Sequence, residues 1–176
     1  MSSIIYAFLW LLALWKWGDW RNWEKYYATI LFFIMGDFIY LYLLSDHFPM
    51  WKYDPLTIDS GFGFTSSHIS LIIMYIKYPA TMLIYLANFP KSNKLKQFLY
   101  FTGWVVFYSI NEVIDLHLKF IKHFNGWNIW WSALFNVVMF FILLVHFKKP
   151  PVAWLLSICF ILFLWNWFEV PSTVFR

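Results

Sequence analysis

The chain has little charge. Asp, Glu, Lys and Arg together make up 12% of its 176 residues, whereas hydrophobic residues make up 62%. Soluble domains have about a quarter charged and about half apolar residues. A water-soluble fold of this size cannot hide so much apolar surface, so the excess must face lipid. We predict an integral membrane protein with a single transmembrane domain over residues 1–176.

Cysteine is almost absent as well. Cys159 is the only one, which excludes an intrachain disulfide and a metal cluster held by several thiolates. We interpret it as a small core or lipid-facing residue. The apolar start, Ile4 to Trp15, has no basic segment before it and no small-residue cleavage site. It is therefore not expected to be a cleaved signal peptide.

Motifs for cofactor binding and catalysis are missing. No His-Glu-x-x-His sequence occurs, and the Gly-Phe-Gly-Phe segment at 61–64 is too short for a loop that cradles phosphate. Ser66 and Ser67 precede His68, but adjacent side chains seldom meet as a nucleophile and its base. A cap for the helix that follows explains these serines better. We predict no cofactor, and no catalytic residue can be named.

A metal site would have to combine histidines and acids from separate segments. His117 and His123 are six residues apart, which is off-phase on a helix. We interpret these side chains as polar groups at the membrane interface and predict no metal, with metal ligation as the alternative. The residues concerned are His47, His68, His117, His123, Asp46, Asp54, Asp59 and Asp115.

Apolar segments recur along the whole chain, and a helix needs about 20 apolar residues to cross a bilayer. They predict an all-α, polytopic membrane helix bundle with six transmembrane helices, or five if residues 3–15 do not fully span. The predicted spans are 3–15, 26–45, 66–89, 98–118, 128–147 and 152–168. Only the connection from Asp46 to Thr65 has room for structure of its own, and its proline and glycine residues predict turns.

Basic residues lie in short clusters between these spans, a pattern typical of topology signals. Eight fall in the loops on one side and four in the loops on the other. The side with eight is expected to be cytoplasmic, which places both termini outside. Tryptophans at the span ends are expected to anchor in the headgroup layer. The net charge of +4 therefore does not indicate a nucleic-acid partner, and the expected surroundings are the lipid bilayer.

Charged and amide side chains also occur within the predicted spans. Ionised groups are costly in a bilayer and persist there mostly by pairing or by serving ions, protons or ligands. With a helical rise of about 1.5 Å per residue, the charged and amide side chains on four different spans are predicted to lie at similar depth. We predict a ligand- or ion-binding site formed by Asp37, Lys77, Tyr108, Asn111, Glu112, Asp115 and Asn136.

The helical periodicity of the fourth span supports this site. Trp104, Tyr108, Glu112, Asp115 and Lys119 recur at steps of three or four residues and so share one face. Lys77 has a long stem and could pair with Asp37. The alternative is an interhelical salt bridge that only fixes packing, and catalysis is a third. Once one acid is paired with Lys77, two acids of the predicted site remain in excess. A structural salt bridge does not require this excess, which therefore favours ligand or ion handling.

Two stretches carry a family resemblance. They are Trp17–Tyr27, followed by Gly36-Asp37 and Trp51-Lys52-Tyr53, and Gly126–Ser132, followed by Phe135, Asn136, Met139 and Lys148-Lys149-Pro150. Together they resemble a family of small tryptophan-rich multi-spanning membrane proteins of spore-forming, low-GC Gram-positive bacteria. The resemblance implies a bacterial plasma-membrane protein. It transfers no catalytic residue, because the family has no assigned activity.

Three functions are therefore open. The first is binding or transport of a small molecule, ion or proton through the buried charged cluster. The alternative is a non-catalytic accessory or assembly protein that docks a membrane-protein partner. The third, which the residues favour least, is a membrane-embedded enzyme that acts on a lipid-like substrate.

Overall fold

The chain is predominantly helical, with 75% of its residues in helices. A computed structural model describes residues 3–55, 61, 63 and 65–175. Within them the α-helices are α1 (Ser3–Trp17), α2 (Tyr27–Leu43), α4 (Ser66–Ile72), α5 (Tyr78–Tyr85), α6 (Lys94–His117), α7 (Ile129–Lys148) and α8 (Pro150–Trp167). Each predicted span contains one of these helices or, at 66–89, two of them. The helical class predicted from the sequence is confirmed.

Among the described residues, three helical segments are long and apolar enough to cross a membrane. They are Ser66–Tyr85, which comprises α4, α5 and the turn between them, together with α7 and α8. Two more helical stretches, Ile4–Trp17 and Tyr27–Leu43, are apolar but shorter. Length and composition are therefore compatible with a membrane location for this protein.

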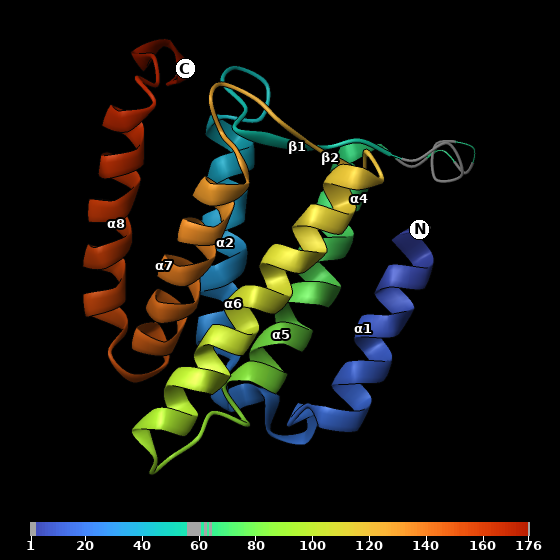
Figure 1. Cartoon of the computed structure of the whole chain (residues 1–176), viewed down its shortest axis with the longest axis vertical. Coiled ribbons are helices and arrows are strands. Elements are labelled where there is room, and N and C mark those ends of the chain that lie inside the picture. Colours follow the sequence, from blue (N-terminus) through green and yellow to red (C-terminus); the bar gives the residue numbers. More distant parts are fainter. Residues whose placement is uncertain (1–2, 56–60, 62, 64, 176) are drawn as a thin grey trace.

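The helices run back and forth between two ends of the molecule (Figure 1). α1 begins and α8 ends at the same end, which also holds the two strands, and the opposite end holds the tight connection between α7 and α8. α6 packs on α7, and α7 packs on α8. α2 contacts both α5 and α7, while α1 packs on α5. This order places α8 at one edge of the bundle and α1 at the other.

Local sequence explains where the helices begin. The Asn93 side chain caps α6 by accepting a hydrogen bond from the Lys96 amide (3.1 Å). Asn128 caps α7 in the same way by accepting from two amides of the first turn. Pro150 and Pro151 open α8, where proline costs nothing because the first amides of a helix have no partner. α4 begins after Thr65, whose hydroxyl lies 2.8 Å from the His68 ring, so Thr65 rather than the expected serines is the cap.

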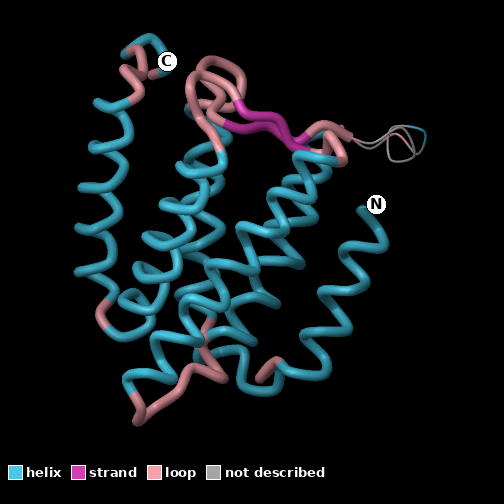
Figure 2. Tube along the Cα trace, in the orientation of Figure 1, coloured by secondary structure: helices cyan, strands magenta, loops and turns pink. Residues whose placement is uncertain are grey.

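A two-stranded antiparallel ribbon, which the sequence analysis did not predict, joins the two loops at one end of the bundle (Figure 2). β1 (Trp51–Tyr53) pairs with β2 (Ile121–His123). The Tyr40 hydroxyl on α2 accepts hydrogen bonds from the amides of Met50 (3.1 Å) and Trp51 (2.8 Å). These bonds hold β1 on the helix bundle, and β2 follows it. Residues 56–60, 62 and 64 of the same loop lie outside the described residues, and with them part of the predicted turns.

Aromatic side chains fill most of the interior. Tyr85 and Phe140 are fully buried near the middle of the bundle, with ring centroids 5.0 Å apart. A second apolar cluster, which includes Met50, Trp127 and Leu164, lies under the ribbon. The two clusters share no residue, so the interior contains two separate apolar regions.

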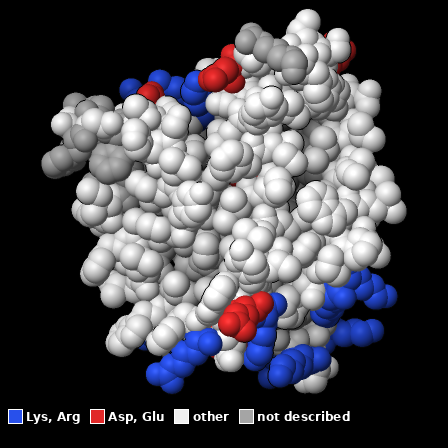
Figure 3. All heavy atoms as spheres, turned by 180° about the vertical axis from the view of Figure 1, so that it is seen from behind, with Lys and Arg blue, Asp and Glu red and all other residues white. Residues whose placement is uncertain are grey.

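Charge is divided unevenly between the two ends. Lys and Arg gather at the end opposite the ribbon, while the apolar sides between the ends carry almost none (Figure 3). At that end, the Asn22 amide donates to the Asp19 carboxylate (2.7 Å) and the Tyr26 hydroxyl donates to its other oxygen (3.0 Å). The hydrogen bond from Asn22 lowers the pKa of Asp19. The observed distribution matches the basic loops that the sequence places on one side.

Candidate ligand-binding site

A widened helical turn positions the one lysine that lies within a predicted span. Ile73–Lys77 is a π-helical turn between α4 and α5. Pro79 follows it in the first turn of α5. Proline cannot donate a hydrogen bond, and its ring collides with the carbonyl group four residues earlier, so a regular α-helix through Tyr75 is disfavoured. The extra residue in the turn resolves this conflict and directs Lys77 into the bundle.

Lys77 is buried, with 9% of its surface exposed. Its ammonium group lies over two aromatic rings, 4.6 Å from the centroid of Tyr108 and 5.4 Å from that of Tyr6. Such contacts stabilise a cation in a dry site by about 2 kcal/mol each. The ion pairs found among the described residues do not include Lys77, so the expected pair with Asp37 does not form. The Lys77 side chain does not point toward Asp37, because its ammonium group lies on the side of α1 and α6 whereas Asp37 is on α2.

A small cavity of about 90 Å³, here called the central cavity, lies beside Lys77. Five of the seven residues predicted for the site line it, from the π-helical turn, α6 and α7. They are Lys77, Tyr108, Glu112, Asp115 and Asn136. The periodicity argument therefore located the inward face of α6 over residues 108–115. Lys119, the last member of that pattern, lies beyond the end of α6 at His117 and does not line the cavity.

Glu112 is tied into the protein by its neighbours. Its Oε1 atom accepts a hydrogen bond from Ser132 on α7 and lies 2.8 Å from Nε2 of His123 on β2. Trp127 in turn donates from its indole nitrogen to the Ser132 hydroxyl (2.8 Å). Glu112 thus joins α6, α7 and the ribbon through its Oε1 atom. We call these four residues the Glu112 clamp.

The two uncharged residues among these five, Tyr108 and Asn136, are also hydrogen-bonded. Tyr108 shares a short hydrogen bond with Thr81 on α5. Asn136 on α7 donates to the Ser109 hydroxyl on α6 (3.3 Å). These contacts hold α5, α6 and α7 at fixed distances around the cavity, because buried polar groups keep their partners.

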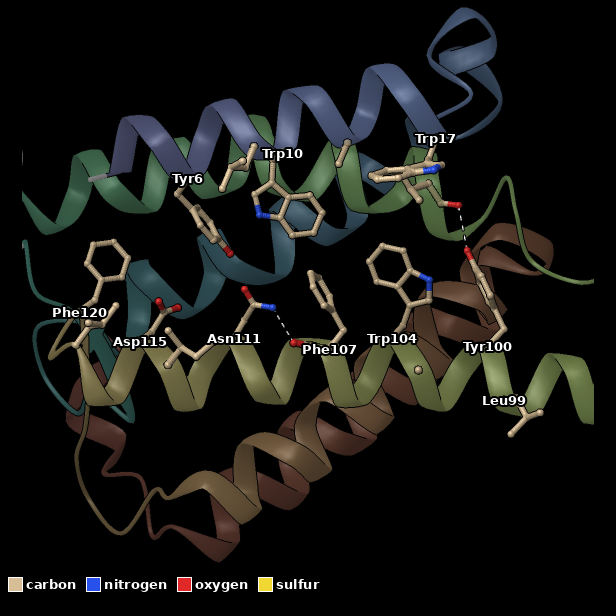
Figure 4. Close-up of a pocket in the computed structure, with 16 residues that line it drawn as sticks. Tyr6, Trp10, Trp17, Leu99, Tyr100, Trp104, Phe107, Asn111, Asp115 and Phe120 are labelled. Atoms are coloured by element: carbon tan, nitrogen blue, oxygen red, sulfur yellow. Dashed lines mark hydrogen bonds between the residues drawn. The ribbon is translucent and has the colours of Figure 1, made fainter. Parts of the chain in front are cut away.

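Asp115 differs from these residues. No hydrogen bond or ion pair joins its carboxylate to another described residue. It lines both the central cavity and a second, larger space of about 740 Å³ between α1 and α6. Asn111 lines only this second space, which we call the aromatic groove (Figure 4). Asp115 therefore marks the place where the two spaces meet.

Asp37 lies apart from the other predicted residues. It lines a third space of about 230 Å³ among α2, α7 and α8, and the Tyr78 hydroxyl interacts with its carboxylate. The similar depth predicted for Asp37 and Glu112 did not bring them into one cavity. The residues predicted for one site are thus divided among three neighbouring spaces, with Asp115 in two of them.

Several contributors were missed by reasoning from the sequence. Ser132 and His123 were not linked to Glu112, and Tyr6 was read as part of a plain apolar segment. Pro79, two positions after Lys77 within the same predicted span, was the available signal for an irregular turn. No sequence signal identifies His123 as a partner of Glu112, because His123 lies on β2, outside the helices.

Metal ligands do not gather in the part of the chain that the structure describes. No group of three histidine, cysteine, aspartate or glutamate side chains is close enough there to hold an ion. Asp59, one of the acids considered from the sequence, lies outside the described residues.

Comparisons with known proteins do not narrow the function. Neither a protein-family model, a curated sequence nor a solved structure matches this chain. The resemblance to tryptophan-rich membrane proteins of Gram-positive bacteria stays a prediction.

Proposed function

We propose that this chain is a multi-pass membrane protein that binds a small cation at the central cavity, as the ligand-binding part of a transporter or sensor. The observation that carries the proposal is the carboxylate of Asp115, which lines the cavity without a hydrogen-bond or ion-pair partner among the described residues. A carboxylate in apolar surroundings is stabilised by a cation or a proton. An alkali ion or a protonated amine would supply that charge.

The charges and dimensions around Asp115 support a cation over an anion. Two acids, Glu112 and Asp115, line the central cavity with a single lysine, Lys77, so its charged side chains are acidic overall. A volume of about 90 Å³ has room for an alkali ion with water, or for an amine of a few heavy atoms. The aromatic rings nearby favour cations as well, as they already do for Lys77.

Ligand-induced stabilisation tests this proposal in purified protein. Apparent melting temperatures in dodecylmaltoside would be compared in sodium, potassium and ethylammonium chloride, with choline chloride as the bulky ionic-strength control. Binding at 100 times Kd stabilises by about 2.7 kcal/mol, or roughly 5–10 °C for a chain of this length. We expect at least one small cation to produce such a shift.

Two matched variants make the experiment specific. Asp115→Asn keeps the shape of the side chain and removes its charge, so it should abolish the shift. Glu24→Gln changes an exposed acid at the basic end and should leave the shift intact. Equal melting temperatures in all four salts, or an undiminished shift in Asp115→Asn, would refute cation binding at this cavity.

The proposal includes a topology of six spans. Its supports are the alternating course of the helices and the concentration of Lys and Arg at the end opposite the ribbon. We expect the basic end in the cytoplasm of a bacterial cell and both termini outside it. In a Cys159→Ala background, cysteine at the exposed position Thr173 should react with an impermeant maleimide in intact cells, and cysteine at Ser92 only after lysis. The reverse pattern would overturn the orientation.

The accessory-protein hypothesis has one observation in its favour. Glu112 is occupied by Ser132 and His123, which is the arrangement expected of a structural group. If none of the four salts stabilises the protein, this second function becomes the better explanation of the buried charges.

A further inference from the structure

The aromatic groove has the size and shape of a site for an elongated molecule. It follows α6 from Leu99 to Leu118, with α1 as its other wall. Leu99 and Asp115 are 16 positions apart, which is about 24 Å along a helix. Its volume of about 740 Å³ falls within the range of about 300–1,000 Å³ that holds small organic ligands. The groove is therefore long and narrow rather than round.

The groove has a carboxylate and an amide near one end, at Asp115 and Asn111. The Tyr100 hydroxyl and the indole nitrogens of Trp17 and Trp104 lie toward the other end (Figure 4). Asn111 donates from Nδ2 to the carbonyl oxygen of Phe107 (2.8 Å), which leaves its Oδ1 atom turned toward the groove (Figure 4). The Asp115 carboxylate points into the same space, and the Tyr6 hydroxyl approaches from α1. That hydroxyl is buried and lies beside the Lys77 ammonium group, which is 5.4 Å from the centroid of the Tyr6 ring. Three acceptors around one space suit a ligand group with several N–H donors.

The rest of the groove is apolar. Aromatic rings of α1 and α6 form its walls, with Trp10 against Phe107 at a centroid distance of 6.0 Å and Trp104 against Phe107 at 5.8 Å. Gly103 on α6 lines the groove, and a methyl group added there would meet no atom within 4 Å. No Lys or Arg side chain is among the described residues that line it. An anionic headgroup would find no cation in this space.

We propose that the aromatic groove binds a single-chain amphiphile with a protonated primary amine, with the amine at Asp115 and Asn111 and the chain along α6 toward Leu99. The site goes beyond the cation site of the central cavity, because the chain occupies a space outside it. The two proposals share Asp115 alone. Charge-assisted hydrogen bonds to a carboxylate are about twice as strong as neutral ones, so the amine should be preferred over an alcohol of equal length.

Native mass spectrometry of the detergent-solubilised protein tests this inference with dodecylamine and dodecanol. The wild-type chain should form a one-to-one adduct with dodecylamine at least tenfold more tightly than with dodecanol. Asp115→Asn should remove this preference and leave the affinity for dodecanol unchanged. Equal affinities of the wild-type chain for the two compounds would overturn the assignment of an amine.

A pair of glycine variants tests the position of the chain. Gly103→Leu places a side chain into the open groove and should abolish binding of both compounds. Gly36→Leu is the matched control, because Gly36 also lies in a helix with open space around it but lines the space beside Asp37. It should bind as the wild type does. Dodecylamine binding that survives Gly103→Leu, or is lost equally in both variants, would refute the groove as the site.

These outcomes separate the two proposals. If ethylammonium stabilises the protein while Gly103→Leu does not affect dodecylamine, the groove proposal fails and the central cavity keeps its assignment. If dodecylamine binding needs Gly103 and Asp115 while small cations have no effect, the cavity proposal fails and the groove proposal stands.

Discussion

Removal of the Glu112 side chain should destabilise the protein far more than removal of its charge alone. The Oε1 atom accepts from Ser132 and lies 2.8 Å from the His123 ring nitrogen. Glu112→Ala leaves both groups without this acceptor, and Ser132 is buried at 4% exposure. Glu112→Gln keeps an oxygen at the same position, so both contacts can persist without the charge.

The expected magnitudes follow from the contacts and their exposure. A hydrogen bond to a charged group contributes about 1.5–3 kcal/mol. The Glu112 and His123 side chains are 18% and 12% exposed, so solvent reduces the loss for two such bonds to about 2–4 kcal/mol. This corresponds to a fall in melting temperature of roughly 4–16 °C at this chain length. The glutamine variant should lose about 1 kcal/mol or less.

Tryptophan fluorescence during thermal unfolding in dodecylmaltoside provides the assay, since Trp127 belongs to the Glu112 clamp. Glu24→Ala, at an exposed site, is the control and should stay within about 0.5 kcal/mol of the wild type. Melting temperatures of Glu112→Ala and Glu112→Gln within 2 °C of each other would refute a structural clamp. Glu112→Gln should weaken the cation-induced shift, because it removes one negative charge from the cavity wall, whereas Asp115→Asn should abolish it.

Three further outcomes follow from the same structure. Lys77→Met removes a positive charge from the wall of the central cavity, so ethylammonium should bind about tenfold more tightly. The concentration dependence of the melting temperature measures this affinity, and weaker binding would argue against a cation site. Tyr40→Phe strips two ribbon amides of their acceptor and should cost about 2–3 kcal/mol; an unchanged melting temperature would show that the ribbon does not depend on Tyr40. Because the pKa of Asp19 is lowered in the folded state, its ionised carboxylate stabilises that state at pH values above the usual Asp pKa of about 4. This stabilisation disappears as the pH falls through the lowered pKa. Asp19→Asn should therefore flatten the melting temperature between pH 5 and pH 3, and an unaltered profile would contradict that role.

The positions of the helices were determined by the sequence alone. Residues 128–147 and 152–168 were predicted as spans, and α7 and α8 run from Ile129 to Lys148 and from Pro150 to Trp167. This agreement has a local cause, since apolar runs bounded by lysine, proline and asparagine carry their own start and stop signals. The ribbon was not predictable in this way. Its strands are three residues long, and Trp51 and His123 meet only because the helices bring their loops together.

The shared face of Tyr108, Glu112 and Asp115 was also readable from the sequence, because all three line the central cavity. What only the tertiary structure decided is the direction of each side chain around its helix axis. Asp37 and Asp115 lie on different helices and face different spaces, because rotation of a helix depends on the neighbours it packs against. The same packing gave Glu112 its partner His123, whereas none of the ion pairs between described residues involves Asp115. The position of a residue along a helix is set by the local sequence, whereas the residues that its side chain contacts are set by the packing of the whole bundle.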